Sequence, residues 1–286
     1  MAIQEFETTV VSPPLKLHCV IAPTGKWAAV NLAELWRHHE LLFFLTLRDV
    51  KVRYKQTALG VVWAVLQPLL TMLVFTLLFG RVAKMPSEGV PYPLFAYAGL
   101  LPWTFFSNGL TTASNALVNN SNLVGKVYFP RLIMPSAAVL SGLIDLGVAF
   151  VLLFGLFAYY HVVLTWQLLF LPLLILLTTL LALGIGFFLC ALNVKYRDIR
   201  HALPFFIQLS MFATPIIYPL SKIPEKWRWL VGLNPMSGVV EGFRAALLGG
   251  PMNWMLLLQS TLIMVVLLVF GALYFRGTEK SFADVI

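Results

Sequence analysis

Charged side chains are scarce in this chain. Of its 286 residues, 11% are charged and 59% are hydrophobic, and the mean hydropathy is +0.85. An ordinary soluble domain carries about 25% charged residues, so this composition excludes a typical soluble core. The charges fall in clusters, and the neutral gaps between them suit membrane helices of about 20 apolar residues. We therefore predict an all-α membrane protein.

Cysteine and the usual catalytic patterns are also missing. Cys19 and Cys190 are too few for a disulfide framework. The sequence has no G-x-x-x-x-G-K-[ST] phosphate loop and no metal-binding cluster of Cys and His. We expect no catalytic residue, no metal ligand and no nucleotide site in this chain. Basic loops at a membrane surface explain the net charge of +8, so we expect no nucleic-acid partner.

Six neutral stretches are long enough to be membrane spans. Between Arg131 and Lys195 the only charge is Asp145, and that gap suits two spans divided near His161. Pro68, Pro204 and Pro215 lie in or near span interiors, where neighbouring helices can satisfy the freed carbonyls. The predicted spans cover roughly residues 59–80, 95–118, 135–158, 167–192, 202–218 and 254–275.

An even number of spans places both termini on the same side of the membrane. Eleven Lys and Arg residues lie near span ends on the side of the termini, against six on the other side. Because basic residues concentrate in cytoplasmic loops, we expect both termini to be cytoplasmic.

The residues before the first span divide into two parts. Residues 1–30 contain several breakers and are predicted to be an irregular cytoplasmic lead, whereas 31–57 has helical periodicity. In that helix an apolar face lies beside a basic face, as in helices that lie in the membrane plane. A solvated charged helix is the alternative. The basic residues that suit a lipid headgroup or anchor the helix are Arg48, Lys51, Arg53 and Lys55.

The stretch 219–251, within the membrane domain of 58–286, is too polar to span yet rich in apolar residues. Pro235 separates two short helical pieces, so we predict a re-entrant or surface-lying hairpin on the outer side, before the last span. Glu241 and Arg244 stand three residues apart, where opposite charges on a helix can pair. Trp227 and Trp229 lie on the first piece.

Two features inside the predicted spans could carry chemistry. Asp145 is a carboxylate at membrane depth, for which we favour a structural role over ion coupling because no other charged residue lies within a predicted span. Aromatic rings crowd the start of the second span, where they form either an interfacial belt or a path on which sugar rings stack. The rings considered for the path are Tyr97, Trp103, Phe105 and Phe106.

A membrane protein without an energy source of its own invites a partner that hydrolyses ATP. The basic, aromatic, proline-marked segment GKVYFPRLIMP lies between two spans on the cytoplasmic side, as a docking helix requires. The rings of Tyr128 and Phe129 are expected to enter a groove of the partner, and Lys126 and Arg131 to fix its orientation. Val127 and Pro130 belong to the same segment, and Arg197 and Asp198 to a second loop on that face.

These motifs resemble the membrane subunit of ABC-2-type polysaccharide exporters. The matching stretches run in order over nearly the whole chain after residue 20. They are ELWRHHELLFFLTLRDVKVRYKQTALG, WAVLQP, PYPLFAYAGLLPW, KVYFPR, LNVKYRD, TPIIYP, LNPM and EKSFADVI.

The resemblance implies a homodimer of six-span subunits in the bacterial cytoplasmic (inner) membrane. Two copies of a separate ATPase would bind ATP and Mg, and residues 122–135 would form the helix that contacts them. The implied substrate is a polysaccharide linked to a polyprenyl-diphosphate lipid. Three alternatives stay open, namely an ABC-2 exporter of a drug or small lipid, a proton-coupled carrier that uses Asp145, and a membrane-embedded glycosyltransferase.

Overall fold

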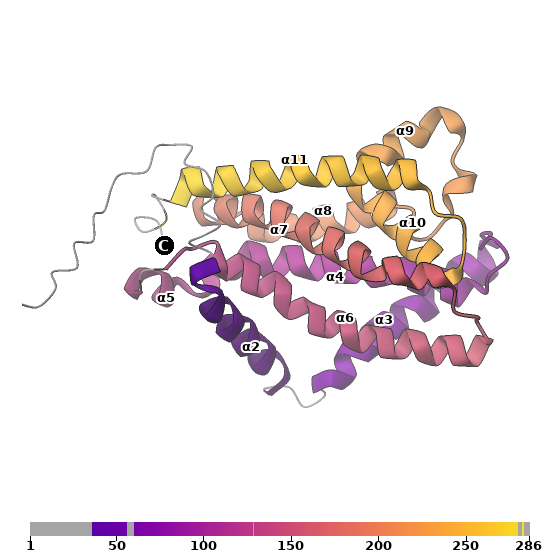
Figure 1. Ribbon diagram of the computed structural model, residues 1–286, viewed down its shortest axis with the longest axis horizontal. Helices are drawn as coiled ribbons and strands as arrows, with labels where there is room; N and C mark the ends of the chain where they lie inside the picture. Colours follow the sequence, from indigo (N-terminus) through magenta and orange to yellow (C-terminus); the bar gives the residue numbers. More distant parts are fainter. Residues whose placement is uncertain (1–35, 56–59, 128, 280–281, 283–286) are drawn as a thin grey trace, which may run out of the picture.

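The computed structural model describes residues 36–55, 60–127, 129–279 and 282, and within these residues every regular element is a helix. Figure 1 shows long helices that run side by side, with α2 inclined beneath one end of the bundle. The predicted all-α class is confirmed for this part of the chain.

Long helices and short helical pieces follow one another along the chain. They are α2 (His39–Lys55), α3 (Gly60–Phe75), η1 (Thr76–Val82), α4 (Tyr92–Asn119), α5 (Ser121–Lys126), α6 (Ile133–Tyr160), η2 (Trp166–Phe170), α7 (Leu171–Lys195), α8 (Ile199–Ala213), η3 (Leu220–Lys222), α9 (Glu225–Leu233), α10 (Pro235–Leu248) and α11 (Trp254–Thr278).

Four helical stretches in the described residues have both the length and the apolar composition of a membrane span. They correspond to the first, third, fourth and sixth predicted spans. Their bounds are Val65–Val82, Ile133–Tyr160, Trp166–Lys195 and Trp254–Thr278.

The other two predicted spans differ from these four. With 28 residues α4 is about 42 Å long, enough to cross a bilayer, but its second half is rich in Ser, Thr and Asn. With 15 residues α8 is only about 22 Å long. The prediction that the fifth span is helical to residue 218 is wrong, because α8 ends at Ala213. Thr214 is extended, as expected of a residue before proline, here Pro215. The count of six spans stays a prediction.

The long helices bring the short elements together at two opposite ends. One end, here called the α5 end, holds α5, the α7–α8 turn and the C-terminal end of α11 (Figure 1). The other, here called the hairpin end, holds the turn at 83–91, the turn at 161–165 and the α9–α10 pair. The count of basic residues assigned these two groups of segments to opposite sides of the membrane. In the structure the two groups lie at opposite ends of the bundle.

The centre of the bundle is formed by α4, α6 and α7, with α11 packed along α7. A Cβ atom on Gly271 of α11 would lie 1.9 Å from the carbonyl oxygen of Gly184 in α7. The absence of both side chains allows these two backbones to touch, as small residues do at helix contacts in membranes.

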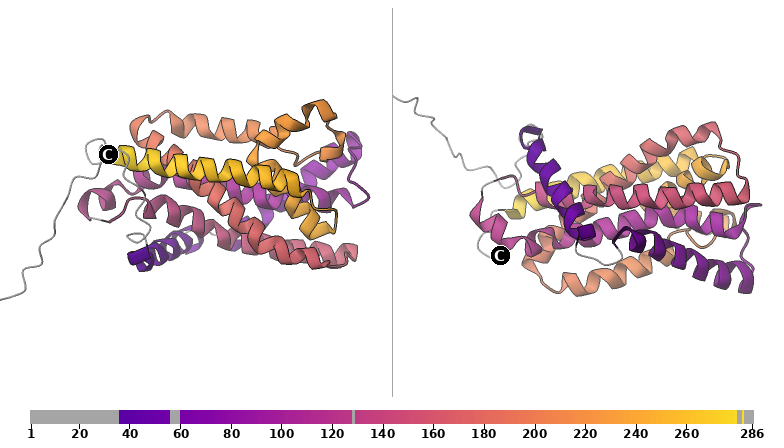
Figure 2. Two further views of the ribbon diagram at one scale, coloured as in Figure 1. Left: turned by 45° about the horizontal axis from the view of Figure 1, so that its top comes forward. Right: turned by 90° about the horizontal axis from the view of Figure 1, so that it is seen from below.

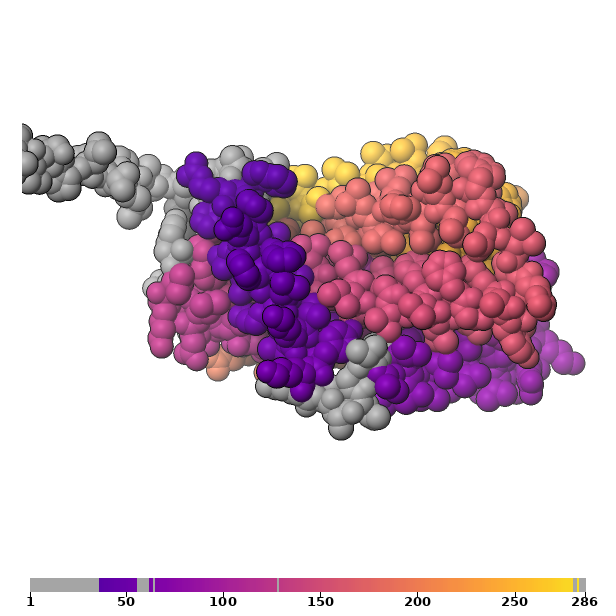
Figure 3. All heavy atoms as spheres, turned by 60° about the horizontal axis from the view of Figure 1, so that its bottom comes forward, coloured from indigo at the N-terminus to yellow at the C-terminus, as the bar shows by residue number. Residues whose placement is uncertain are grey.

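The helix α2 lies across the bundle near the α5 end (Figures 2 and 3). It packs on α6, and Leu45 is buried while Phe43 and Phe44, like Trp36 just before the helix, are exposed. A helix with one face on protein and large apolar side chains on another suits a membrane interface. Residues 31–35 and 56–57 of the predicted helix, and the predicted lead at 1–30, lie outside the described residues.

The stretch 219–251 contains two short helices, α9 and α10, on either side of Asn234 and Pro235. The side chain of Asn234 accepts a hydrogen bond from the backbone N–H of Met236 at 3.0 Å and so caps α10. The helix α10 is buried against α4, α7 and α11, whereas α9 is exposed. The depth of this hairpin in a membrane stays a prediction.

Candidate functional sites

The segment assigned to contact with an ATPase forms α5 and the turn that follows it, at the α5 end (Figure 1). Gly125, Lys126 and Val127 are exposed. Phe129, in contrast, is only 6% exposed, and Pro130 is also buried. The ring of Phe129 therefore fills the core of this subunit, and its contact with a partner stays a prediction.

Phe129 belongs to a cluster of apolar side chains at the α5 end. The cluster joins α2, the α4–α6 connection, α7 and α11, and includes Phe187 and Phe275. Packing into this cluster fixes the exposed part of the segment relative to two spans. Tyr128, the other ring of the predicted docking motif, lies outside the described residues.

Arg131 ties the same segment to the end of α11. Its backbone N–H donates to a carboxylate oxygen of Glu279 at 3.3 Å, and its guanidinium donates to the carbonyl oxygen of that residue. The guanidinium also lies 6.0 Å from the centre of the Phe282 ring. Arg276 forms an ion pair with Glu279 at 3.5 Å. Arg131 therefore holds the segment in place within its own chain.

The second predicted contact, the turn between α7 and α8, is open to solvent. Tyr196, Arg197 and Asp198 are all exposed. The ammonium group of Lys195 lies 5.2 Å from the centre of the Tyr196 ring. This turn and α5 together give the α5 end an exposed, mainly basic surface formed by Lys126, Lys195, Arg197 and Arg200.

Asp145, the acid within the predicted third span, meets the C-terminal end of α2. The guanidinium of Arg53 and the phenol of Tyr54 both donate to its carboxylate. Arg53 also donates to the hydroxyl of Ser141, one turn earlier in α6, at 3.2 Å. Burial, followed by the hydrogen bond to Asp145, raises the pKa of Tyr54 to about 12. The phenol therefore stays protonated and keeps donating at ordinary pH.

This arrangement separates the four basic residues proposed for headgroup contact. Arg53 faces the protein, and Arg48 pairs with the neighbouring Asp49 at 2.8 Å. Lys51 and Lys55 are exposed. The two lysines are placed for headgroup contact, which stays a prediction, while Arg53 attaches α2 to α6.

The aromatic rings proposed for a sugar path are buried. Tyr97 is fully buried and donates to the carbonyl oxygen of Ala149 in α6 at 2.9 Å. Trp103, Phe105 and Phe106 are also in the core shared by α4, α6 and α7. These four rings therefore line no open path in this arrangement of the subunit, and their contact with sugar stays a prediction.

At the hairpin end, Arg244 has a role that its sequence position did not reveal. It is 5% exposed and pairs with Glu241 at 3.2 Å, as the spacing of three residues indicated. Its guanidinium also donates to the carbonyl oxygens of Pro215 at 2.6 Å, of Ile216, and of Phe95 at 3.4 Å. The ring of Phe95 lies 3.7 Å away. One arginine thus joins α10, the start of α4 and the break after α8.

Burial raises the pKa of the Glu241 carboxyl, and the charge of Arg244 opposes that shift. Buried backbone carbonyls need hydrogen-bond partners, and the non-helical residues 214–219 leave several of them free. Arg244 satisfies two of these carbonyls at once.

The two tryptophans of the predicted outer hairpin, Trp227 and Trp229, are 51% and 60% exposed on α9.

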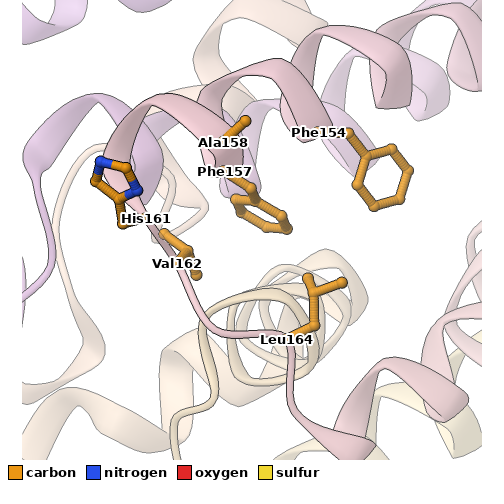
Figure 4. Close-up of a pocket in the computed structure, with 6 residues that line it drawn as sticks. All are labelled: Phe154, Phe157, Ala158, His161, Val162 and Leu164. Atoms are coloured by element: carbon orange, nitrogen blue, oxygen red, sulfur yellow. The ribbon is translucent and has the colours of Figure 1, made fainter.

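A shallow pocket lies where α6 ends and turns toward η2 (Figure 4). Phe154 and Phe157 project from α6, and Leu164 of the turn points toward Phe157. His161 is the one titratable side chain in the lining, which also includes Ala158 and Val162. An apolar hollow with a single imidazole offers no set of converging polar groups, so we place no functional site there.

The sequence was compared with known proteins. The model of the ABC-2 type transporter family matches residues 40–248. The chain belongs to this membrane family. It is 31% identical to an O-antigen export system permease protein, RfbA, of Myxococcus xanthus, over 88% of this chain and 98% of that protein.

Two further relatives of this ABC-2 family chain are also named as glycan transport proteins. RfbA of Klebsiella pneumoniae is 28% identical over 86% of this chain and 95% of its own. The polysialic acid transport protein KpsM of Escherichia coli is 26% identical over 83% of this chain and 93% of its own. The resemblance stated from the motifs is confirmed.

Proposed function

We propose that this chain is the transmembrane subunit of an ATP-driven exporter that moves lipid-linked polysaccharide across the cytoplasmic membrane. The observation that carries the proposal is the similarity to O-antigen and capsule permeases along almost the full length of both chains. A chain that is helical in its described residues, with four apolar spans, suits a subunit whose work is done within the bilayer.

The energy comes from a separate ATPase that binds ATP and Mg and docks at the α5 end. Exposure supports this location, since Lys126 and Val127 of the first segment and Arg197 and Asp198 of the second are accessible there. Phe129, Pro130 and Arg131 act behind this surface by attaching it to the spans. Closure of the ATPase then moves α4 and α6, the helices on either side of the docking segment.

Two copies of the chain, with two copies of the ATPase beneath them, form the transporter. Each copy crosses the inner membrane six times, with both termini in the cytoplasm and the α9–α10 hairpin re-entering the outer leaflet. The large exposed apolar faces of α3 and α8 support contact with a second copy or with lipid. On α8 they include Phe205, Phe206, Leu209 and Phe212.

The test is deletion of the chain and complementation in its native cells. We expect the surface polysaccharide to disappear on deletion, lipid-linked polysaccharide to accumulate inside, and both changes to be reversed by the wild-type chain. Unchanged surface polysaccharide, together with loss of efflux of a lipophilic dye, would instead favour the exporter of a drug or small lipid.

A further inference from the structure

A row of uncharged polar side chains runs along the second half of α4. We define the α4 polar stripe as Thr104, Asn108, Thr111, Asn115 and Asn119. Their spacing of three or four residues places them on one face of the helix. Asn108, Thr111 and Asn119 are exposed, and the other two are half-buried. The stripe thus forms a continuous polar track on an otherwise apolar bundle.

The opposite face of the same helix is packed against α6 and α7. A Cβ atom on Gly109 would lie 3.5 Å from the Cβ of Ala182 in α7, and one on Gly186 of α7 would lie 3.0 Å from the Cβ of Ala113. Leu110 and Leu117 are buried on that side. Because the apolar face already fills the core, α4 cannot rotate the stripe inward.

The stripe retains unused hydrogen-bonding capacity. The hydroxyl of Thr111 donates to the carbonyl of Ser107 at 2.9 Å, and the amide of Asn115 donates to that of Thr111 at 2.8 Å. The amide oxygen of Asn115 already accepts a bond from the side chain of Asn193 in α7 at 3.2 Å. Because a hydroxyl or amide oxygen has two lone pairs, the side-chain oxygens of Thr111 and Asn115 can each accept at least one more bond. The side chain of Asn108 makes no hydrogen bond to any described residue.

A polar group placed in hydrocarbon without a partner costs several kcal/mol, so an exposed asparagine amide at this depth is not expected to face lipid tails. From Thr104 to Asn119 the stripe is about 22 Å long, against about 30 Å for the hydrocarbon core. It reaches the α5 end, since Asn119 is the last residue of α4. Water, a hydrogen-bonding ligand or polar groups of a second copy must therefore meet the stripe over most of the inner part of the span.

The chemistry of the stripe favours one class of ligand. Hydroxyl and amide groups both donate and accept, as sugar hydroxyls do, and the sequence from Gly89 to Gly125 carries no charge that would hold an ion or a headgroup. Repeated neutral contacts bind weakly at each step, which suits a polymer that must keep moving. We propose that the α4 polar stripe is the surface along which a hydroxyl-rich glycan chain slides through the membrane.

This inference rests on the proposed function. It locates the transport surface on the α4 polar stripe and not on the buried rings of Tyr97 and Trp103.

In the complex with its ATPase, Asn108→Leu with Thr111→Val should lower surface polysaccharide at least tenfold and leave ATPase co-purification within twofold of wild type. Thr261→Val is the matched control, because its hydroxyl donates to its own helix, at the carbonyl of Leu257 in α11. It should change export less than twofold.

Accessibility is measured with single cysteines at 108, 111 and 115 in a Cys19→Ser chain, using a charged, water-soluble methanethiosulfonate reagent. Cys190 is fully buried and gives the background rate. Membrane vesicles come from cells that make the polymer and from cells that cannot. We expect labelling in empty vesicles and labelling at least fivefold slower when polymer is present.

Equal labelling with and without polymer would overturn the inference, because the stripe would then line water only. No labelling in either preparation would also overturn it, because a second copy or lipid would then cover the stripe. If deletion of the chain abolishes surface polymer while the cysteines show no protection, this inference fails and the proposed function stands. If deletion leaves surface polymer unchanged, both fail.

Discussion

Two basic residues at opposite ends of the bundle, Arg244 and Lys126, are used in opposite ways. At the hairpin end, the guanidinium of Arg244 is buried and bonded to backbone carbonyls from two other segments. At the α5 end, Lys126 and Arg197 are exposed on short elements. A buried, fully bonded cation stabilises its own fold, whereas an exposed basic surface is available to another chain. The docking proposed for the α5 end uses residues of the second kind, Lys126 and Arg197.

The largest effect is expected from Arg244→Leu. The change leaves the Glu241 carboxylate buried without its partner and removes the donors to three carbonyl oxygens, and breaking a buried pair costs about 3–5 kcal/mol. The purified complex should melt at a much lower temperature and accumulate poorly. Arg228→Leu, at an exposed arginine of α9, is the control. Equal melting temperatures for the two variants would refute the stabilising role of Arg244.

Phe129→Ala should come next, through stability and not through lost contact with the ATPase. Truncation of a buried phenylalanine costs about 3–5 kcal/mol in protein cores. Phe129→Leu should restore most of the thermal stability and most of the export, and Phe270→Ala, at a half-exposed ring of α11, should melt near wild type. A Phe129→Ala chain that melts normally and yet loses the ATPase would restore the docking role of this ring.

The ion pair between α2 and α6 should give an intermediate effect. Asp145→Asn alone removes the negative charge that faces Arg53, whereas Arg53→Gln with Asp145→Asn removes both charges of this pair. The double variant should therefore be more stable to heat and export more than either single variant. An Asp145→Asn chain that assembles, stimulates the ATPase normally and exports nothing would contradict this account and support the proton-coupled carrier.

The smallest effect is expected from Trp227→Ala with Trp229→Ala. Both rings are exposed on α9, where interfacial anchoring is their physical role. Export should fall a few-fold, as measured by surface polysaccharide, while the ATPase still co-purifies. Loss of the ATPase would mean that the hairpin end is the side that docks it.

Much of this fold follows from the sequence. Charge clusters located the apolar spans and the ends at which Lys126 and Arg228 lie, and Pro235 marked the division between α9 and α10. Periodicity located α2. These features depend on local composition and spacing, which a sequence displays directly.

The contacts made over long sequence distances could not be read in this way. Arg53 lies 92 residues from Asp145, and Arg244 lies 149 residues from Phe95. Aromatic content at the start of α4 suggested a path, but Tyr97 and its neighbours are buried because α6 and α7 pack on that half of the helix. The regular spacing of polar residues from Thr104 to Asn119 is visible in the sequence. That these side chains face outward follows only from their exposure in the structure.

The most direct test introduces negative charge at each end in turn and compares the two variants. Tagged chains with Lys126→Glu and Val127→Asp at the α5 end, or with Lys222→Glu and Lys226→Glu at the hairpin end, are extracted from native cells in mild detergent. All four positions are exposed, so both variants should fold and melt like wild type. The account predicts that an ATPase with a phosphate loop co-purifies with the wild type and with the hairpin-end variant, and is lost from the α5-end variant. Retention by the α5-end variant and loss from the hairpin-end variant, or no such ATPase with any chain even after cross-linking, would contradict it.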